Sequence, residues 1–143
     1  MKYKKCKVVF CIIFVIAVGI QFIPVNRTNP PVIGEIEAPE EIMAILHRSC
    51  FDCHSNETKW PWYSYVAPAS WLVAKDVRDA RSHINFSEWV NYNSKQQKHK
   101  QEECGEMVAI GEMPLWFYLP LHSEATLSKE EIELIVTWSG LKE

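Results

Sequence analysis

A chain of 143 residues has room for one ordinary domain, and its formal charge of −3 is mildly acidic. From Gly34 onward ten basic residues stand against all eighteen acidic ones, a formal charge of −8. This balance argues against binding to nucleic acid and against docking on anionic lipid.

The N-terminus has a basic stretch followed by an apolar one. Four lysines precede residues 8–23, an apolar run that only Gln21 interrupts. The pattern predicts an export or anchor segment over residues 1–24. Cleavage signals are poor, so we expect a single-pass anchor in a bacterial inner membrane, with the lysines in the cytoplasm and the C-terminal domain in the periplasm. A cleaved signal peptide is the alternative.

Residues 25–38 are rich in proline and predict an extended tether. The domain then spans residues 39–143 and reads as all-α, because no stretch alternates long enough to form a strand. Helices are predicted over residues 39–50, over residues 68–84, from about Phe86 to a polar bend, from that bend to before Gly111, and over residues 127–138. The last one starts with a capping box, Ser128 with Glu131.

All six tryptophans lie in this small domain. A chain of this size buries only a modest fraction of its surface, so large aromatic rings are needed to stabilise it. The same rings could instead surround a large, flat, apolar ligand.

The strongest chemical signal is Cys50-Phe51-Asp52-Cys53-His54, a C-x-x-C-H motif. This is the attachment sequence of c-type haem. Thiols three positions apart on a helical turn face one side and can add to the two vinyl groups of a porphyrin. The next residue, His54, then supplies an axial nitrogen to the iron. Export agrees with this interpretation, because bacteria attach covalent haem outside the inner membrane.

Three other uses of the motif have to be weighed. A zinc site would need a fourth ligand, such as Cys104 or His83, and adjacent Cys53 and His54 do not readily reach one tetrahedral metal. A thiol-disulfide C-x-x-C usually follows a strand, which this domain does not offer. A structural disulfide would leave His54 unexplained. Haem is therefore favoured over all three.

The sixth iron ligand is predicted to be Met113, in a loop between Gly111 and Pro114. A thioether carried by such a loop can meet the iron from the face opposite His54, as in small cytochromes with Met/His ligation. His122 is the next candidate, and His83 follows. The other candidates in the domain are Met43, Met107, His47 and His99. Met43 and His47 precede the motif on its own helix, and His99 lies in a polar run.

Two long runs resemble a known family. They are "CFDCHSNETKWPWYSYVAPASWLVAKDVRDARSHINFSEW" and "GEMPLWFYLPLHSEATLSKEEIELIVTW". Together they resemble the small bacterial haem-binding domain family, single-haem proteins with an N-terminal membrane anchor, over roughly residues 40–139. The resemblance implies covalent haem on Cys50 and Cys53 with His54 as proximal ligand, and it supports Met113 as distal ligand. Leu115, where a second proline is common, and Cys104, in a segment usually filled with charged residues, depart from the family pattern.

The expected protein is thus a small cytochrome c-like, all-α domain around one covalently bound haem c (iron), preceded by a membrane helix. Its expected function is that of a periplasmic electron carrier with redox partner proteins, rather than an enzyme. The alternatives are a haem sensor or enzyme with a displaceable sixth ligand and, less favoured, a thiol-disulfide or zinc protein.

Two features stay open at this stage. Trp60-Pro61-Trp62-Tyr63 could wall the porphyrin edge or pack between the haem-bearing turn and the following helix, and Arg48, Lys59 and Arg78 are candidate propionate partners. Cys104 is either a small buried apolar residue, which we favour, or a thiol for an intermolecular disulfide.

Overall fold

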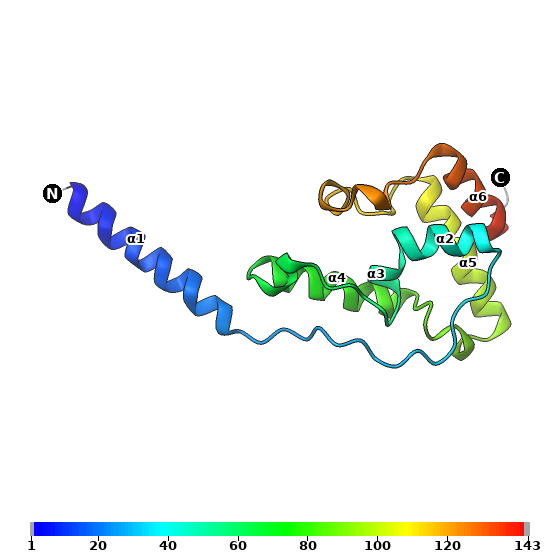
Figure 1. The fold of residues 1–143 in the computed structure, drawn as a ribbon, viewed down its shortest axis with the longest axis horizontal. Helices are drawn as coiled ribbons and strands as arrows, with labels where there is room; N and C mark the ends of the chain where they lie inside the picture. The colour runs from blue at the N-terminus through cyan, green and yellow to red at the C-terminus, as the bar shows by residue number, and fades with distance from the viewer. Residues whose placement is uncertain (1, 142–143) are drawn as a thin grey trace. The chain divides into compact units, whose positions relative to one another are not determined.

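The computed structural model describes residues 2–141, and all regular elements in this range are helical (Figure 1). The predicted all-α fold is therefore confirmed. The α-helices are α1 (Lys2–Gly19), α2 (Glu40–Ser49), α3 (Phe51–His54), α4 (Ala69–His83), α5 (Ser94–Ala109) and α6 (Lys129–Ser139). Short 3-10 helices lie between them: η1 (Ile20–Phe22), η2 (Trp62–Tyr65), η3 (Trp89–Asn91), η4 (Leu119–Leu121) and η5 (Ser123–Ala125).

The chain forms two compact units. The first unit combines the N-terminal part, up to Thr28, with Trp60–Asp76. The second unit combines Asn29–Lys59 with the chain from Val77 onward, and it contains the C-x-x-C-H motif.

Helix α1 in the first unit carries the predicted apolar segment. Over Lys5–Phe22 it is long and apolar enough to cross a membrane, and none of that stretch is buried inside the protein. No other helix among residues 2–141 has this property.

The second unit is built around two clusters of buried side chains. Both receive residues from α2, whose start matches the prediction: Glu40 and Glu41 lie in its first turn, where the helix dipole favours acids. The first core cluster consists of Ile36, Ile42, Leu46, Phe51, Ile84 and Phe86. The second core cluster consists of Ile45, Val108 and Ile135.

Helices α5 and α6 lie side by side, and α2 contacts α6 (Figure 1). A Cβ atom on Gly105 would lie only 2.0 Å from Oγ of Ser139, so the two helices can approach this closely only with glycine at that position. The predicted capping box of α6 is confirmed: the Ser128 hydroxyl accepts from the Glu131 N–H, and the Glu131 carboxylate accepts from the Ser128 N–H. Gly140, with φ of +70°, ends the helix.

The predicted helix start near Phe86 is wrong. Residues 86–88 form no helix, and α5 begins only at Ser94, after the capping residue Asn93. Instead, the Phe86 N–H donates to the carbonyl of His54 at 2.8 Å, and the Ile36 N–H donates to the carbonyl of Phe86 at 2.9 Å. The predicted tether, residues 25–38, thus belongs to the second unit from Asn29 onward.

Candidate haem-attachment site

The C-x-x-C-H motif lies at the junction of α2 and α3. Cys50 breaks α2 with a φ of −126°, and its carbonyl accepts the N–H of Cys53 at 3.1 Å and of His54 at 2.9 Å. The motif therefore forms one tight helical turn. The two thiols and the imidazole come from this single turn, as attachment to a porphyrin requires.

Backbone carbonyl groups hold the imidazole of His54. Its Nδ1 atom lies 3.2 Å from the carbonyl oxygen of Ile84, the residue directly after α4. A carbonyl can only accept, so Nδ1 carries the proton and Nε2 keeps its lone pair. A hydrogen bond of this kind fixes the tautomer and the ring orientation of a histidine that binds a metal.

Burial lowers the pKa of His54, although the hydrogen bond to Ile84 acts in the opposite direction. The imidazole is therefore neutral at physiological pH, the protonation state that binds a metal. The ring also lies 6.0 Å from the ring of Phe86, which belongs to the first core cluster.

The thiol of Cys50 occupies an apolar environment. Burial raises the pKa of Cys50 to about 12, and the nearby thiols of Cys104 and Cys53 act in the same direction. Cys50 and Cys104 both pack against the first core cluster. Cys104 is thus placed as a small apolar residue would be, beside the motif rather than on a remote surface.

A buried polar network holds the residues that follow the motif. The Asn56 side chain donates to the Pro31 carbonyl at 3.0 Å and accepts from Nδ2 of Asn85 at 2.8 Å. The Asn56 N–H donates to the hydroxyl of Ser87 at 2.9 Å. Asn56, Asn85 and Ser87 are each at most 4 % exposed. Sequence reasoning missed these residues, which tie His54 to the segment that carries its hydrogen-bond acceptor.

Arg81 supports the same loop from α4. Its guanidinium donates to the carbonyl of Ser55 at 2.7 Å, to the hydroxyl of Thr58 at 2.8 Å and to Oδ1 of Asn29 at 2.9 Å. One planar group therefore joins three separate stretches around the motif.

Asp52, between the two motif cysteines, connects α3 to the chain beyond Met113. Its carboxylate accepts from the N–H of Lys59 at 3.0 Å and from the hydroxyl of Tyr118 at 3.1 Å. The Tyr118 ring stacks on His122, with centroids 4.0 Å apart.

Met113 is half-buried and packs against the second core cluster. Its N–H donates to the carbonyl of Met107 at 3.2 Å, in a turn that includes Gly111 with a φ of +76°. The predicted loop at the end of α5 is therefore present, while the methionine itself packs against the second core cluster.

The other candidate ligands are distributed over the second unit. Met43 packs against the first core cluster, and His47 lies 3.9 Å from the ring of Phe51 and 3.2 Å from the carboxylate of Glu35. His122 pairs with Glu124 at 3.3 Å. His83 is exposed, and its backbone carbonyl accepts a hydrogen bond from Nζ of Lys100.

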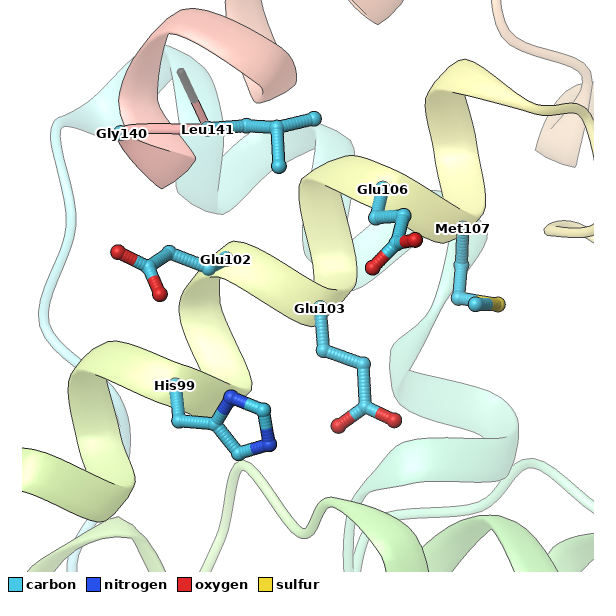
Figure 2. Close-up of a pocket in the computed structure, with 7 residues that line it drawn as sticks. All are labelled: His99, Glu102, Glu103, Glu106, Met107, Gly140 and Leu141. Carbon is cyan, nitrogen blue, oxygen red and sulfur yellow. The ribbon is translucent and has the colours of Figure 1, made fainter. Parts of the chain in front are cut away.

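A surface pocket of about 380 Å³ runs along α5 (Figure 2). His99 and Met107 contribute to it, together with three glutamates of the same helix and the end of α6. Among the described residues no three histidine, cysteine or acidic side chains form a group that could hold a metal ion.

Two of the candidate propionate partners are already paired with acids. Arg48 contacts Glu131 at 2.7 Å, and Arg78 contacts Asp79 at 3.2 Å. In the first unit Trp60 is half-buried and Trp62 is exposed, so the aromatic residues of Trp60-Pro61-Trp62-Tyr63 are not buried together.

Comparison with known proteins gives one match. The family model described as haem-binding domain covers residues 15–140. No curated protein and no solved structure matched the chain. The match includes the motif turn, the buried network behind it and the Met113 loop. The chain therefore belongs to the haem-binding domain family.

Proposed function

We propose that this protein is a membrane-tethered, mono-haem c-type cytochrome that carries single electrons in the bacterial periplasm. Cys50 and Cys53 would bind the haem covalently through thioether links, and His54 would supply the proximal nitrogen. When bound, the haem would supply reversible one-electron chemistry at its iron.

The observation that carries the proposal is the position of His54. Its Nδ1 faces the carbonyl of Ile84 at 3.2 Å, which would leave Nε2 to coordinate the iron, one residue after the second thiol. A thiol-disulfide protein would need neither the imidazole nor this fixed tautomer. Membership of the haem-binding domain family agrees with this use of the motif.

Met113 is proposed as the distal ligand. It follows α5 in a turn anchored on the Met107 carbonyl, and the Tyr118–Asp52 hydrogen bond links the segment beyond it to α3. Met/His ligation would leave no open position for a substrate and would raise the reduction potential relative to two histidines. These two consequences favour an electron carrier over an enzyme.

Tethering by α1 is supported by its length and composition and by the lysines that precede its apolar part. The positive-inside rule would then place the second unit on the periplasmic side. Its partners would be redox proteins of that compartment.

A second candidate is a haem sensor or enzyme with a displaceable sixth ligand. The packing of Met113 against the second core cluster favours this alternative, since a methionine used as core filler leaves the distal side of the iron free. The two candidates differ in what Met113 does.

Carbon monoxide binding separates them. If Met113 is a ligand, the reduced wild type binds carbon monoxide slowly or not at all. Met113→Ala then binds it rapidly and loses the far-red methionine–iron band of the oxidised spectrum. Met43→Ala serves as the control and keeps the wild-type spectrum. Rapid binding by the wild type, with no change in Met113→Ala, would establish the sensor or enzyme class instead.

A further inference from the structure

We propose that the segment Trp60–Leu72 is a membrane-interface surface, which lies at the headgroup level of the bilayer beside the outer end of α1. The inference rests on the tether of the proposed function. It adds a lipid-facing surface in the first unit to a protein whose haem chemistry lies in the second.

The composition of this segment differs from that of the rest of the domain. Residues 60–74 contain no charged side chain, whereas the chain from Gly34 onward carries a formal −8. They include three tryptophans and two tyrosines within twelve positions, from Trp60 to Trp71. Tryptophan and tyrosine are the residues enriched where a protein crosses the membrane–water interface.

The apolar side chains of this segment are exposed. Trp62 is 75 % exposed, Tyr65 60 % and Leu72 50 %, and Val66 and Trp71 are exposed as well. Five such residues on one short stretch form more apolar surface than scattered exposed residues usually do, and a patch of this kind indicates a binding surface.

The contacts within the first unit place this surface at the end of the apolar helix. The Gln21 side chain pairs with both backbone groups of Ala67: Nε2 donates to the carbonyl at 3.2 Å, and Oε1 accepts the N–H at 2.9 Å. Gln21 lies in the last turn of the stretch that could span a membrane, Lys5–Phe22. Ala67 is thus tied to the level at which the span ends.

Arg27 makes a second link just beyond that level. Its guanidinium donates to the Ser64 carbonyl at 3.1 Å and lies 4.5 Å from the centre of the Tyr65 ring. A cation over an aromatic ring suits the headgroup region, where arginine can meet phosphates while the ring enters the acyl boundary.

The length of α1 gives a reason for such a surface. A span of 18 residues rises about 27 Å at about 1.5 Å per residue, slightly less than a hydrocarbon core of about 30 Å. A short span is stabilised by flanking residues that anchor at the interface. Because the segment is uncharged, its binding would depend on apolar contact and not on anionic lipid, which agrees with the acidic charge of the domain.

The test uses the full-length, haem-loaded chain in phosphatidylcholine vesicles that contain a lipid with a photoactivatable diazirine high in the acyl chain. After illumination, mass spectrometry measures lipid adducts on each peptide. We expect the peptide with residues 60–74 to carry several-fold more adduct than the α6 peptide. Salt at about 0.5 M shortens the Debye length to a few ångströms and so screens charge interactions, and it should leave this ratio unchanged.

Paired variants sharpen the result. Val66→Ser with Leu72→Ser should lower the labelling of residues 60–74 several-fold. The matched control, Ile110→Ser with Leu121→Ser, removes two aliphatic residues of the second unit that are even more exposed than Val66 and Leu72, and it should leave that labelling unchanged. Haem content is measured in both pairs.

Three outcomes would overturn the inference. Labelling of residues 60–74 at the α6 level, while α1 is labelled and resists carbonate extraction, rejects the surface and leaves the tether intact. Loss of haem without loss of lipid adduct in the Val66/Leu72 pair assigns the surface to haem packing. Extraction of the whole chain by carbonate rejects the tether itself, and the inference falls with it.

Discussion

Arg81 Nε donates a hydrogen bond of 2.7 Å to the carbonyl oxygen of Ser55, the residue directly after the C-x-x-C-H motif. The same guanidinium binds Thr58 and Asn29. The loop that leaves the motif is thus fixed by a side chain of α4 whose own helix leads to Ile84, the acceptor for His54. Arg81 is a positioning residue that acts on His54 through the backbone.

Arg81→Ala should therefore lower the free energy of unfolding by about 2 kcal/mol, because it leaves buried acceptors around the motif without a charged donor. It should also broaden the haem absorption band, since the orientation of His54 is less constrained. Denaturant unfolding and optical spectra check both effects. Arg78→Ala on the same helix, which removes an ion pair with the exposed Asp79, is the control and should change neither. Equal effects in the two variants would contradict a positioning role.

Asn56→Ala should be more damaging, at about 3 kcal/mol of unfolding free energy. The change leaves the Asn85 amide without its acceptor and the Pro31 carbonyl without its donor in a site where both asparagines are almost fully buried. Thermal unfolding measures the loss. Asn91→Ala, at an exposed position in η3, should remain within experimental error of the wild type. A stable Asn56→Ala protein would show that water replaces the network at little cost.

The contact between α2 and α6 should depend on pH. The Ser128 N–H and the neighbouring Arg48 lower the pKa of Glu131 below its ordinary value. A carboxyl whose pKa is depressed by folding contributes stability above its unfolded-state pKa, and this contribution is lost as the pH falls through the folded value.

Glu131→Gln can keep the capping hydrogen bond but removes the charge, so it should cost about 1 kcal/mol at neutral pH, a typical upper value for a carboxylate at a helix N-terminus, and nothing at a pH below both values. Urea midpoints measured across the acid range check this. Glu133→Gln, which is exposed and not part of the capping box, should follow the wild-type pH profile. A pH-independent difference between Glu131→Gln and the wild type would argue against the ionised cap.

Cys104 should be a slow thiol in the native protein. Burial raises the pKa of Cys104 to about 12, so at neutral pH its thiolate fraction is lower than that of an ordinary cysteine by roughly a thousandfold. Alkylation followed by mass spectrometry should modify Cys104 only after denaturation. Cys104→Ala should retain haem, because the residue packs against the first core cluster and is not needed for attachment. A disulfide-linked dimer under native conditions would point to the opposite role.

The predictions from sequence were best where the signal is local. The capping box of α6 and the apolar face of α2 depend on residues a few positions apart, and both helices formed as expected. Phe86, Trp89 and Val90 also have helical spacing, yet no α-helix starts there. The Asn85 side chain accepts the Ser87 N–H, and the Ile33 N–H binds the Ser87 carbonyl at 2.9 Å. Side chains that bind nearby backbone groups compete with helix formation.

Long-range partners explain what sequence reasoning missed. The backbone carbonyl of Ile84 fixes His54, and the side chains of Asn85 and Arg81 fix the loop that follows it; all three residues lie about thirty positions away from their partners. Neither a carbonyl acceptor nor a buried asparagine pair has a sequence pattern. The motif itself was readable because its chemistry fits within five residues.

The most direct test of the account is the intact mass of the native, full-length protein, made in bacterial cells with working cytochrome c maturation. The account predicts the mass of the polypeptide plus one haem that survives denaturation, and the bare polypeptide mass for the double variant Cys50→Ala with Cys53→Ala. A wild-type protein that carries nothing beyond the polypeptide after denaturation would contradict it.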